Sequence, residues 1–419
     1  MSHSIKISLT FLLSLFVIST ANGSGPGGSK SILKAEIDSI IMSQVNPGKI
    51  PGAVILIKKD NKTLCRQAYG YAMKFDYNHI PVNPPEKMTA GHMFDLASLT
   101  KVIGTTTSIM LLADRGQLSI DDPAGKYIKA FRSPDKKEIT LRHMLTHTAG
   151  LYEWYPLYYL ASTKEESYRV IGELPLKYPV GAGRHYSDLG FVILGEIIEN
   201  VSGMSLEEFM RENIFLPLRM NNTTFNPLSS GRYRKIAATS AGNPYEKRMV
   251  YDSTLGFKVK EIDPQQWNGW RTYLLKGEVN DGNAWYANGG VSGAAGLFST
   301  AADLQKLVDM LINKGMTRHG RFLSPETVTT FLTKDKFSNG LGWVMDTENS
   351  FMKNAPEGSF GHTGFTGTSI AVIPSENISV IILINRQNTG LSDEGNYYNP
   401  NPLRMQIFMA VLRYMSEKS

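Results

Sequence analysis

A serine followed three residues later by a lysine is the first feature of this chain that could do chemistry. Ser98 and Lys101 lie where an extended segment meets an apolar stretch, residues 101–113, with helical periodicity. Residues i and i+3 share one face of a helix, about 5–6 Å apart, so the hydroxyl and the amine can touch. A serine becomes nucleophilic when a neighbour takes its proton, and a lysine does so if burial or positive charge lowers its pKa. Backbone N–H groups at a helix start also favour developing negative charge. The pattern predicts an acyl-transfer site.

The spacing alone is weak because the chain repeats it. Further copies lie at Ser31/Lys34, Ser133/Lys136 and Ser350/Lys353. None of them opens a long apolar helix, so a surface or helix-capping role is favoured there. The setting of Ser98 is what distinguishes it.

Two further segments could complete such a site. Tyr186, in Tyr-Ser-Asp-Leu-Gly, directly precedes a helical run. A lysine ammonium nearby would favour its phenolate and lower its pKa, so that it could relay a proton between the serine and a leaving group. His362-Thr363-Gly364-Phe365 precedes the strand-like residues 368–373. Glycines permit close backbone approach, and an edge strand offers N–H groups for an oxyanion hole. Each segment alone is more often an ordinary loop, but the set in this order is specific.

The apolar periodicity predicts the elements that must position these residues. Helices are expected at 31–45, 101–113, 141–145, 191–201, 206–214 and 402–415, and strands at 53–57, 63–69, 340–345, 368–373 and 378–384. The expected fold class is α+β, with one antiparallel sheet flanked by helices and built from 24–117 and 296–419. Residues 118–295 would form a mainly helical second lobe, and the active site would lie between the two.

At this point the chain resembles a known family, the serine hydrolases related to class C β-lactamases and low-molecular-weight penicillin-binding D,D-peptidases. This group also includes esterases and D-aminopeptidases. The resemblance is carried by the three segments above, by Leu145–Leu151 (LTHTAGL) and by Gly289–Thr300, and it covers nearly the whole mature chain. It implies the β-lactamase/D,D-peptidase fold, an acyl-enzyme intermediate, and no cofactor or metal.

The resemblance also implies catalytic roles. Ser98 would be the acylated nucleophile, and Lys101 and Tyr186 would share the general-base and general-acid roles, in a division that stays open. The oxyanion hole would be formed by the backbone N–H groups of Ser98 and Phe365. A Ser-His-Asp triad through His147 is the alternative, but a histidine in a Thr-His-Thr turn is more often structural.

Two departures from the family pattern bear on the substrate-binding residues, Asp188 and His362-Thr363-Gly364. Asp188 stands where many relatives carry asparagine. An ionised aspartate only accepts hydrogen bonds, so it disfavours the acylamino recognition used for penicillins and could instead pair with Lys101 or bind a substrate ammonium. His362 stands where β-lactamases usually carry lysine and, mostly neutral near pH 7, would bind a carboxylate less firmly. We therefore expect a peptidase first, an esterase second and a β-lactamase third.

The first 23 residues read as a secretory signal, with Lys6, an apolar core at residues 7–18 and small residues after it. An uncleaved anchor is the alternative; no later stretch is long and apolar enough to span a bilayer. The protein is therefore expected to be periplasmic or secreted, with no stable membrane span after cleavage. The single cysteine, Cys65, forms no internal disulfide and is expected in the core.

Net charge and histidine spacing limit the kinds of molecule that the protein is expected to bind. The net charge of +6 comes without a basic stripe carrying aromatics, so nucleic acid is excluded as a partner. The eight histidines show no metal-binding spacing. The expected substrate is a small peptide, ester or β-lactam, plausibly derived from peptidoglycan. Two other classes stay open: a penicillin-binding sensor or inactive protein on the same scaffold, and a carbohydrate- or peptide-binding module that uses the aromatic run Tyr152–Tyr159.

Overall fold

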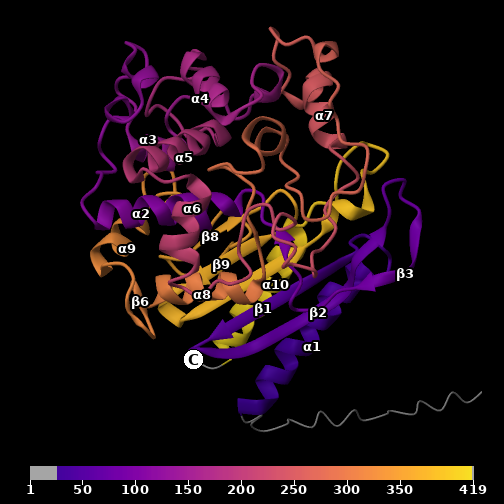
Figure 1. Cartoon of the computed structure of the whole chain (residues 1–419). Coiled ribbons are helices and arrows are strands. Elements are labelled where there is room, and N and C mark those ends of the chain that lie inside the picture. The colour runs from indigo at the N-terminus through magenta and orange to yellow at the C-terminus, as the bar shows by residue number, and fades with distance from the viewer. Residues whose placement is uncertain (1–25, 418–419) are drawn as a thin grey trace, which may run out of the picture.

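A six-stranded antiparallel sheet with the order β3-β2-β1-β10-β9-β8 forms the centre of the fold (Figure 1). The computed structural model describes residues 26–417, so the expected signal segment, residues 1–23, lies outside the described residues. The strands of the sheet are β1 (Gly52–Lys59), β2 (Lys62–Phe75), β3 (Pro81–Lys87), β8 (Phe360–Thr363), β9 (Ser369–Ile373) and β10 (Ile378–Ile384). Two short pairs stand apart: β4 (Phe94–Asp95) with β5 (Phe298–Ser299), and β6 (Met316–Thr317) with β7 (Gly320–Arg321). Both ends of the chain build the sheet, which confirms the expected fold class.

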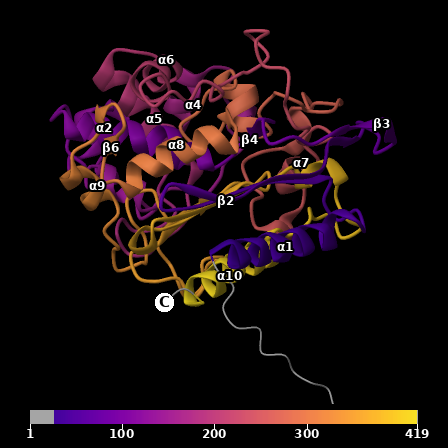
Figure 2. The ribbon, with the colours of Figure 1, turned by 90° about the horizontal axis from the view of Figure 1, so that it is seen from below.

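Helices cover both faces of the sheet. They are α1 (Pro26–Val45), α2 (Thr107–Asp114), α3 (Leu141–Leu145), α4 (Lys164–Glu173), α5 (Asp188–Ser202), α6 (Leu206–Met210), α7 (Pro244–Tyr251), α8 (Ala301–Ile312), α9 (Pro325–Phe331) and α10 (Asn401–Ser416). The first and last helices, α1 and α10, lie side by side against one face, while α8 packs on β1 and β10 from the other (Figure 2). Helices α2 to α6 lie beyond α8, away from the terminal pair.

Strand β1 shows why the sheet lies between two cores. Its side chains point alternately to opposite faces, as the two-residue period of a strand requires. Val54 and Leu56 join the core on the α8 side, whereas Ala53, Ile55 and Ile57 join the core beneath α1 and α10. A continuous apolar run, rather than an alternating one, is the sequence pattern of a strand buried on both faces. Cys65 is buried in the second core, as expected.

One expected strand is wrong. Residues 340–345 form bends, and Val344 makes only isolated bridges with Asn339 and Gly361. Gly342 adopts a φ of +82°, a left-handed conformation that interrupts an extended strand. The chain instead forms an edge strand further on, β8, which holds His362 and Thr363 and was absent from the expected strands. The other expected helices and strands are present, with ends displaced by a few residues.

Residues 26–417 contain no single helix with both the length and the apolar composition to cross a membrane; by those two criteria alone, only the bent pair Asp188–Ser202 and Leu206–Phe215 could.

Candidate active site

Ser98 lies on a sharp turn between strand β4 and a helix. Ala97, just before it, has a φ of +46°, which is unusual for a residue with a side chain. The carboxylate of Asp95 holds this turn, because its Oδ1 accepts a hydrogen bond from the N–H of Ala97 at 2.9 Å. The chain then enters a π-helical turn (Lys101–Thr106) that continues as α2. Strained backbone and π-turns both concentrate at functional sites. Ser98 itself is half-buried and lines a cleft.

Lys101 is buried directly beneath Ser98, with 1% of its surface exposed. Its Nζ donates to Ser98 Oγ at 3.0 Å and to the carbonyl oxygen of Ala294 at 3.0 Å, and it pairs with Asp188 Oδ1 at 2.7 Å. Two hydrogen-bond acceptors and one carboxylate counterion therefore lie around this amine, as suits an ammonium. Burial works to lower the pKa of Lys101, but the charge of Asp188, helped by Tyr186, outweighs it and raises the pKa above its ordinary value.

The ion pair between Lys101 and Asp188 bears on two points that the sequence left open, the charge of Lys101 and the partner of Asp188. From the sequence, Lys101 could take the proton of Ser98 if burial or positive charge lowered its pKa. The structure instead holds Lys101 as an ammonium, because Asp188 is its counterion. Pairing with Lys101 was one of the two alternatives open for Asp188, and it is the one that the geometry favours. An ammonium donates and cannot accept, so the proton of Ser98 needs another acceptor.

Tyr186 supplies an oxygen in the right place. Its hydroxyl has hydrogen-bonding contacts with the side chains of Ser98 and Lys101. Burial raises the pKa of the phenol, and the nearby ammonium of Lys101 lowers it by less, so the pKa lies above its ordinary value. The expectation of a lowered pKa is therefore wrong: the sequence could show the cation nearby but not how far burial of the phenol opposes its effect.

His147 packs against the ring of Tyr186 and accepts a hydrogen bond from the backbone. The two ring centroids lie 4.3 Å apart, and His147 Nδ1 accepts a hydrogen bond from the N–H of Ser187 at 3.0 Å. Burial, together with the positive charges of Arg184 and Lys101, lowers the pKa of the imidazole well below its ordinary value. A neutral ring that accepts from the backbone next to Tyr186 fits the structural interpretation better than a catalytic triad.

The third predicted segment approaches Ser98 from the edge strand β8. Gly364 follows this strand, and a Cβ there would lie 2.3 Å from the carbonyl oxygen of Leu96. Only glycine permits this contact, which brings the segment against the strand that leads to Ser98. Within residues 26–417, the N–H groups of Ser98 and Phe365 donate no hydrogen bond to another protein group. Both are therefore available to a ligand.

His362 is buried on this strand as a neutral ring. Burial, and then the positive charge of Lys101, lower its pKa to about 3. Its Nδ1 lies 2.9 Å from the carbonyl oxygen of Thr363, which fixes the orientation of the ring. The sequence suggested a histidine that is neutral most of the time near pH 7; the structure gives one that stays neutral well below that pH.

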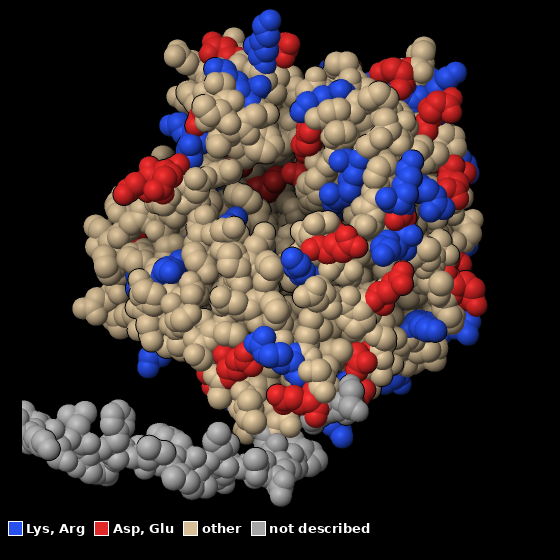
Figure 3. All heavy atoms as spheres, turned by 180° about the vertical axis from the view of Figure 1, so that it is seen from behind, with Lys and Arg blue, Asp and Glu red and all other residues tan. Residues whose placement is uncertain are grey.

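These segments meet in a cleft of about 940 Å³. Its lining includes Ser98, Tyr186, Asp188, His362 and Thr363, so the segments predicted from distant parts of the chain face one cavity. Figure 3 shows a hollow on this side of the molecule with acidic side chains in its wall. Of the aromatic run Tyr152–Tyr159, only Glu153 and Trp154 are among the lining residues.

The other serine–lysine pairs lack this arrangement. Ser350 lines the same cleft, but its hydroxyl donates to the carbonyl oxygen of Asp346 and accepts from the N–H of Met352. Lys136 pairs with its neighbour Asp135. Lys34 lies on the exposed side of α1 and pairs with Asp38. The structure therefore brings a lysine onto a serine hydroxyl at Ser98.

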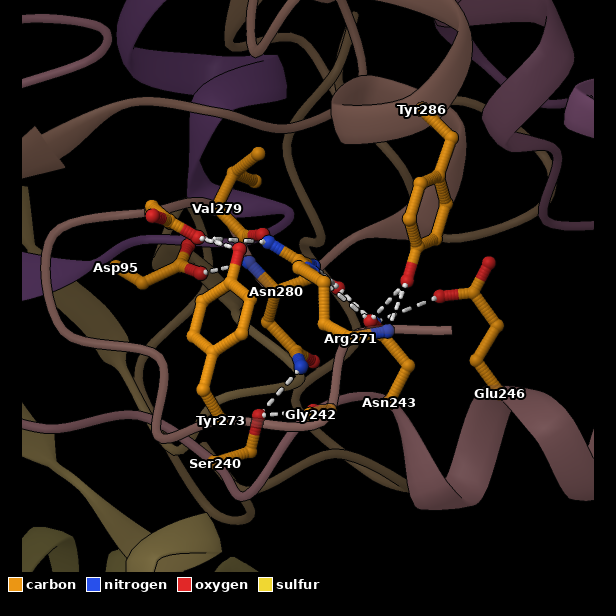
Figure 4. A network of polar contacts seen from close by, with 11 residues as sticks. Asp95, Ser240, Gly242, Asn243, Glu246, Arg271, Tyr273, Val279, Asn280 and Tyr286 are labelled. Atoms are coloured by element: carbon orange, nitrogen blue, oxygen red, sulfur yellow. Dashed lines mark hydrogen bonds and ion pairs between the residues drawn. The ribbon is translucent and has the colours of Figure 1, made fainter. Parts of the chain in front are cut away.

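A polar network missed by the sequence reasoning braces the turn at Ser98 (Figure 4). Asp95 Oδ2 accepts from the N–H of Asn280 at 2.6 Å, and the side chain of Asn280 donates to Ser240 Oγ at 2.8 Å. Asn243 accepts from Arg271 Nε at 3.0 Å and donates to the carbonyl oxygen of Asn280 at 2.6 Å. Burial raises the pKa of Asp95 to about 6. The network joins the turn at Ser98 to loops nearly two hundred residues away, which no local pattern could reveal.

Two partly buried acids, Glu246 and Asp281, also line the cleft without any sequence signal. Burial, followed by repulsion from Asp281, raises the pKa of Glu246 to about 8, and burial followed by repulsion from Asp188 raises that of Asp281 to about 6. Residues 26–417 hold no group of three or more His, Cys, Asp or Glu side chains arranged for a metal ion.

Comparison with known proteins agrees with this geometry. The sequence profile of the family described as Beta-lactamase matches residues 37–400. The chain belongs to this family, as the sequence motifs indicated. Its homologues and fold identify it as a serine hydrolase, with the substrate unresolved.

Particular relatives cover most of the chain. It is 31% identical over 389 residues to an N-acetylmuramyl-L-alanine amidase of Bacillus subtilis, covering 87% of this chain and 83% of that one. It is 32% identical over 386 residues to a putative D-alanyl-D-alanine carboxypeptidase of Escherichia coli K12, covering 87% and 85%. Among solved structures, the octameric penicillin-binding protein homologue from Pyrococcus abyssi matches with a TM-score of 0.65 and 24% identity, covering 90% of this chain and 77% of that one. That likeness supports the fold.

Proposed function

We propose that the protein is an exported serine hydrolase that cleaves amide or ester bonds of peptidoglycan-derived substrates through an acyl-enzyme on Ser98. The observation that carries this is the contact of 3.0 Å between Lys101 Nζ and Ser98 Oγ inside a cleft shared with Tyr186. The names of the two relatives, an N-acetylmuramyl-L-alanine amidase and a putative D-alanyl-D-alanine carboxypeptidase, favour substrates of this kind.

The protonation states suggest how the proton moves. Because Lys101 is an ammonium that donates to Ser98 Oγ, the serine proton is directed to another acceptor, and the oxygen of Tyr186 is the candidate. In the active form Tyr186 is a phenolate, which the ammonium of Lys101 stabilises. In acylation, Ser98 Oγ bonds to the substrate carbonyl carbon while its proton passes to this phenolate oxygen. The N–H groups of Ser98 and Phe365 receive the oxyanion.

Collapse of this intermediate completes acylation. The bond from the carbonyl carbon to the leaving nitrogen or oxygen breaks, and Tyr186 returns its proton to that atom. Water then attacks the acyl-enzyme, gives its proton to Tyr186, and the proton passes back to Ser98 Oγ as the acid product leaves. The active form needs one proton fewer on the Lys101–Tyr186 pair, so the rate should rise with pH above neutrality.

A fluorophosphonate probe tests the assignment. The probe should label the wild type at Ser98 and leave Ser98→Ala unlabelled. Ser350→Ala is the matched control, since it removes a serine with the same spacing to a lysine in the same cleft. Lys101→Ala should lower turnover of an aryl ester by at least ~10²-fold. Labelling that survives Ser98→Ala, or turnover that survives Lys101→Ala, contradicts the proposal.

The same probe addresses the two non-hydrolytic alternatives. A penicillin-binding sensor would be labelled by a fluorescent penicillin and remain acylated without turnover, whereas an inactive protein would not be labelled. Export is tested separately: the mass of the protein recovered from the exported fraction should correspond to a chain that starts near residue 24.

A further inference from the structure

Arg184 is a cation in the cleft that the mechanism above does not use. It lies two residues before Tyr186 and lines the cleft together with Ser98 and His362. The centre of its guanidinium is 5.9 Å from the centroid of the Tyr186 ring, over the ring face. Its positive charge is also felt at His362, whose pKa it helps to lower. Arg184 therefore borders the reacting centre on the side where Tyr186 and His362 meet.

The guanidinium has donors to spare. Among residues 26–417, no hydrogen bond or ion pair involves its side chain, and its Nε is buried without a partner. Asp335 and Asp346 act on it at a distance without forming an ion pair. Burial lowers its pKa, which records the cost of removing this charge from water. A half-buried guanidinium with free donors is matched best by a planar anion such as a carboxylate.

The other positive or potentially positive groups near Ser98 are not suited to that task. Lys101 is buried, donates to Ser98 and Ala294, and already has Asp188 as its counterion. His362 is a buried neutral ring. Lys353 lines the cleft but is exposed, so its charge is screened by water. The subsite that the family resemblance led us to expect at His362 therefore lacks its positive charge, and Arg184 supplies one nearby.

We propose that Arg184 binds a carboxylate on the leaving group of the substrate. The assignment to the leaving group rests on the function proposed above, in which Tyr186 returns its proton to the departing atom: a carboxylate on Arg184 lies beside that phenol. The preferred substrates are then acylated amino acids or peptides cleaved next to a free carboxylate, and the leaving group departs as an amino acid or hydroxy acid.

A matched pair of activated esters tests this. N-acetylglycine is esterified to 3-hydroxybenzoate or to 3-hydroxybenzamide, which differ by one carboxylate in the leaving group. Each kcat/KM is divided by the rate of alkaline hydrolysis of the same ester, to remove the difference in leaving-group reactivity. The wild type should prefer the carboxylate ester, and Arg184→Gln should lose roughly 10- to 100-fold on that ester with little change on the amide.

Two further variants sharpen the result. Arg184→Lys should restore part of the preference, because the charge returns without the fork of donors. Lys353→Gln, which removes the other cationic side chain among the described lining residues, should leave the preference unchanged. A wild type without preference, or an equal loss on both esters in Arg184→Gln, overturns the assignment of Arg184. Absence of hydrolysis of both esters by the wild type, with no probe labelling of Ser98, instead overturns the proposed function itself, and the inference with it.

Discussion

Replacing Asp188 by asparagine should make the Lys101–Tyr186 pair lose its proton at a lower pH. Asp188 Oδ1 lies 2.7 Å from Lys101 Nζ, and its charge raises the pKa of both Lys101 and Tyr186. The substitution removes the charge and keeps the size of the side chain. Because the active form needs one proton fewer on the pair, the rising limb of the pH–rate profile should move toward acid.

The size of the shift follows from the ion pair. At a charge separation of about 4 Å and an effective dielectric constant of about 20, the attraction is ~4 kcal/mol. At 1.36 kcal/mol per pKa unit this corresponds to about 3 units, an upper value. Asp281, which also interacts with Lys101, remains in the variant and keeps part of the attraction. We therefore expect a displacement of about 1–3 pH units.

The rate at neutral pH should increase by a smaller factor than the fraction of enzyme in the deprotonated, active form. A base with a lower pKa is also a weaker base, which offsets roughly half of the gain on a logarithmic scale. At pH 7, kcat/KM for an aryl ester should therefore increase by roughly 3- to 30-fold. Asparagine can also donate to an acylamino carbonyl, so acylation by a fluorescent penicillin should become faster.

The assay is the pH dependence of kcat/KM for an aryl ester, from pH 5 to pH 10, in wild type and Asp188→Asn. Circular dichroism at each pH excludes unfolding as the cause of any change. A profile that keeps its position, or moves toward alkali, refutes the argument that Asp188 holds the proton on the pair. An unchanged or slower penicillin acylation counts against the hydrogen-bonding interpretation of this position.

Two other predictions concern residues around the site. His147→Asn keeps an acceptor for the N–H of Ser187 and should retain kcat/KM within about 10-fold, whereas loss of a general base costs at least ~10²-fold. A loss as large as that of Lys101→Ala would instead support the Ser-His-Asp triad through His147. Glu246 has a folded-state pKa raised from 4.5 to about 8, so the wild type loses free energy of unfolding as pH rises between those values. Glu246→Gln should therefore gain stability relative to wild type, on the order of 1–5 kcal/mol, between pH 5 and pH 8.5 in urea titrations; a constant difference would contradict the raised pKa.

The sequence predicted the elements whose apolar pattern is strong. Strands β1 and β10 are continuous apolar runs buried on both faces, and α5 has a long apolar stripe after a capping serine, Ser187. Strand β8 was missed because its four residues carry no period of their own; its pairing with β9 defines it. The false strand at 340–345 is apolar enough, but the left-handed Gly342 sets its conformation.

The sequence predicted which residues lie close to Ser98 better than it predicted their protonation states. Motif order brought Ser98, Lys101 and Tyr186 together; in the structure Ser98 and Tyr186 line one cleft, and Lys101 lies buried in contact with Ser98. Their protonation depends on burial and on the direction of the Asp188 carboxylate, neither of which a one-dimensional pattern contains. Arg184 stands out because its buried Nε has no hydrogen-bond partner among residues 26–417. A sequence cannot show this, since it depends on where the neighbouring acidic side chains lie.

The ion pair between Lys101 and Asp188 stabilises the buried charge of Lys101 but lowers the basicity of the site. A lysine with 1% exposure cannot keep its charge in the core without a counterion, and Asp188 provides one. The same carboxylate raises the pKa of the groups that must give up a proton, so it makes the site more stable and less basic at neutral pH. An asparagine would relax this restraint, and the Lys101–Tyr186 pair would then lose a proton at a lower pH. The aspartate therefore suits an enzyme whose substrate is held by other charges, such as that of Arg184, and which works without the acylamino hydrogen bond that an asparagine would donate.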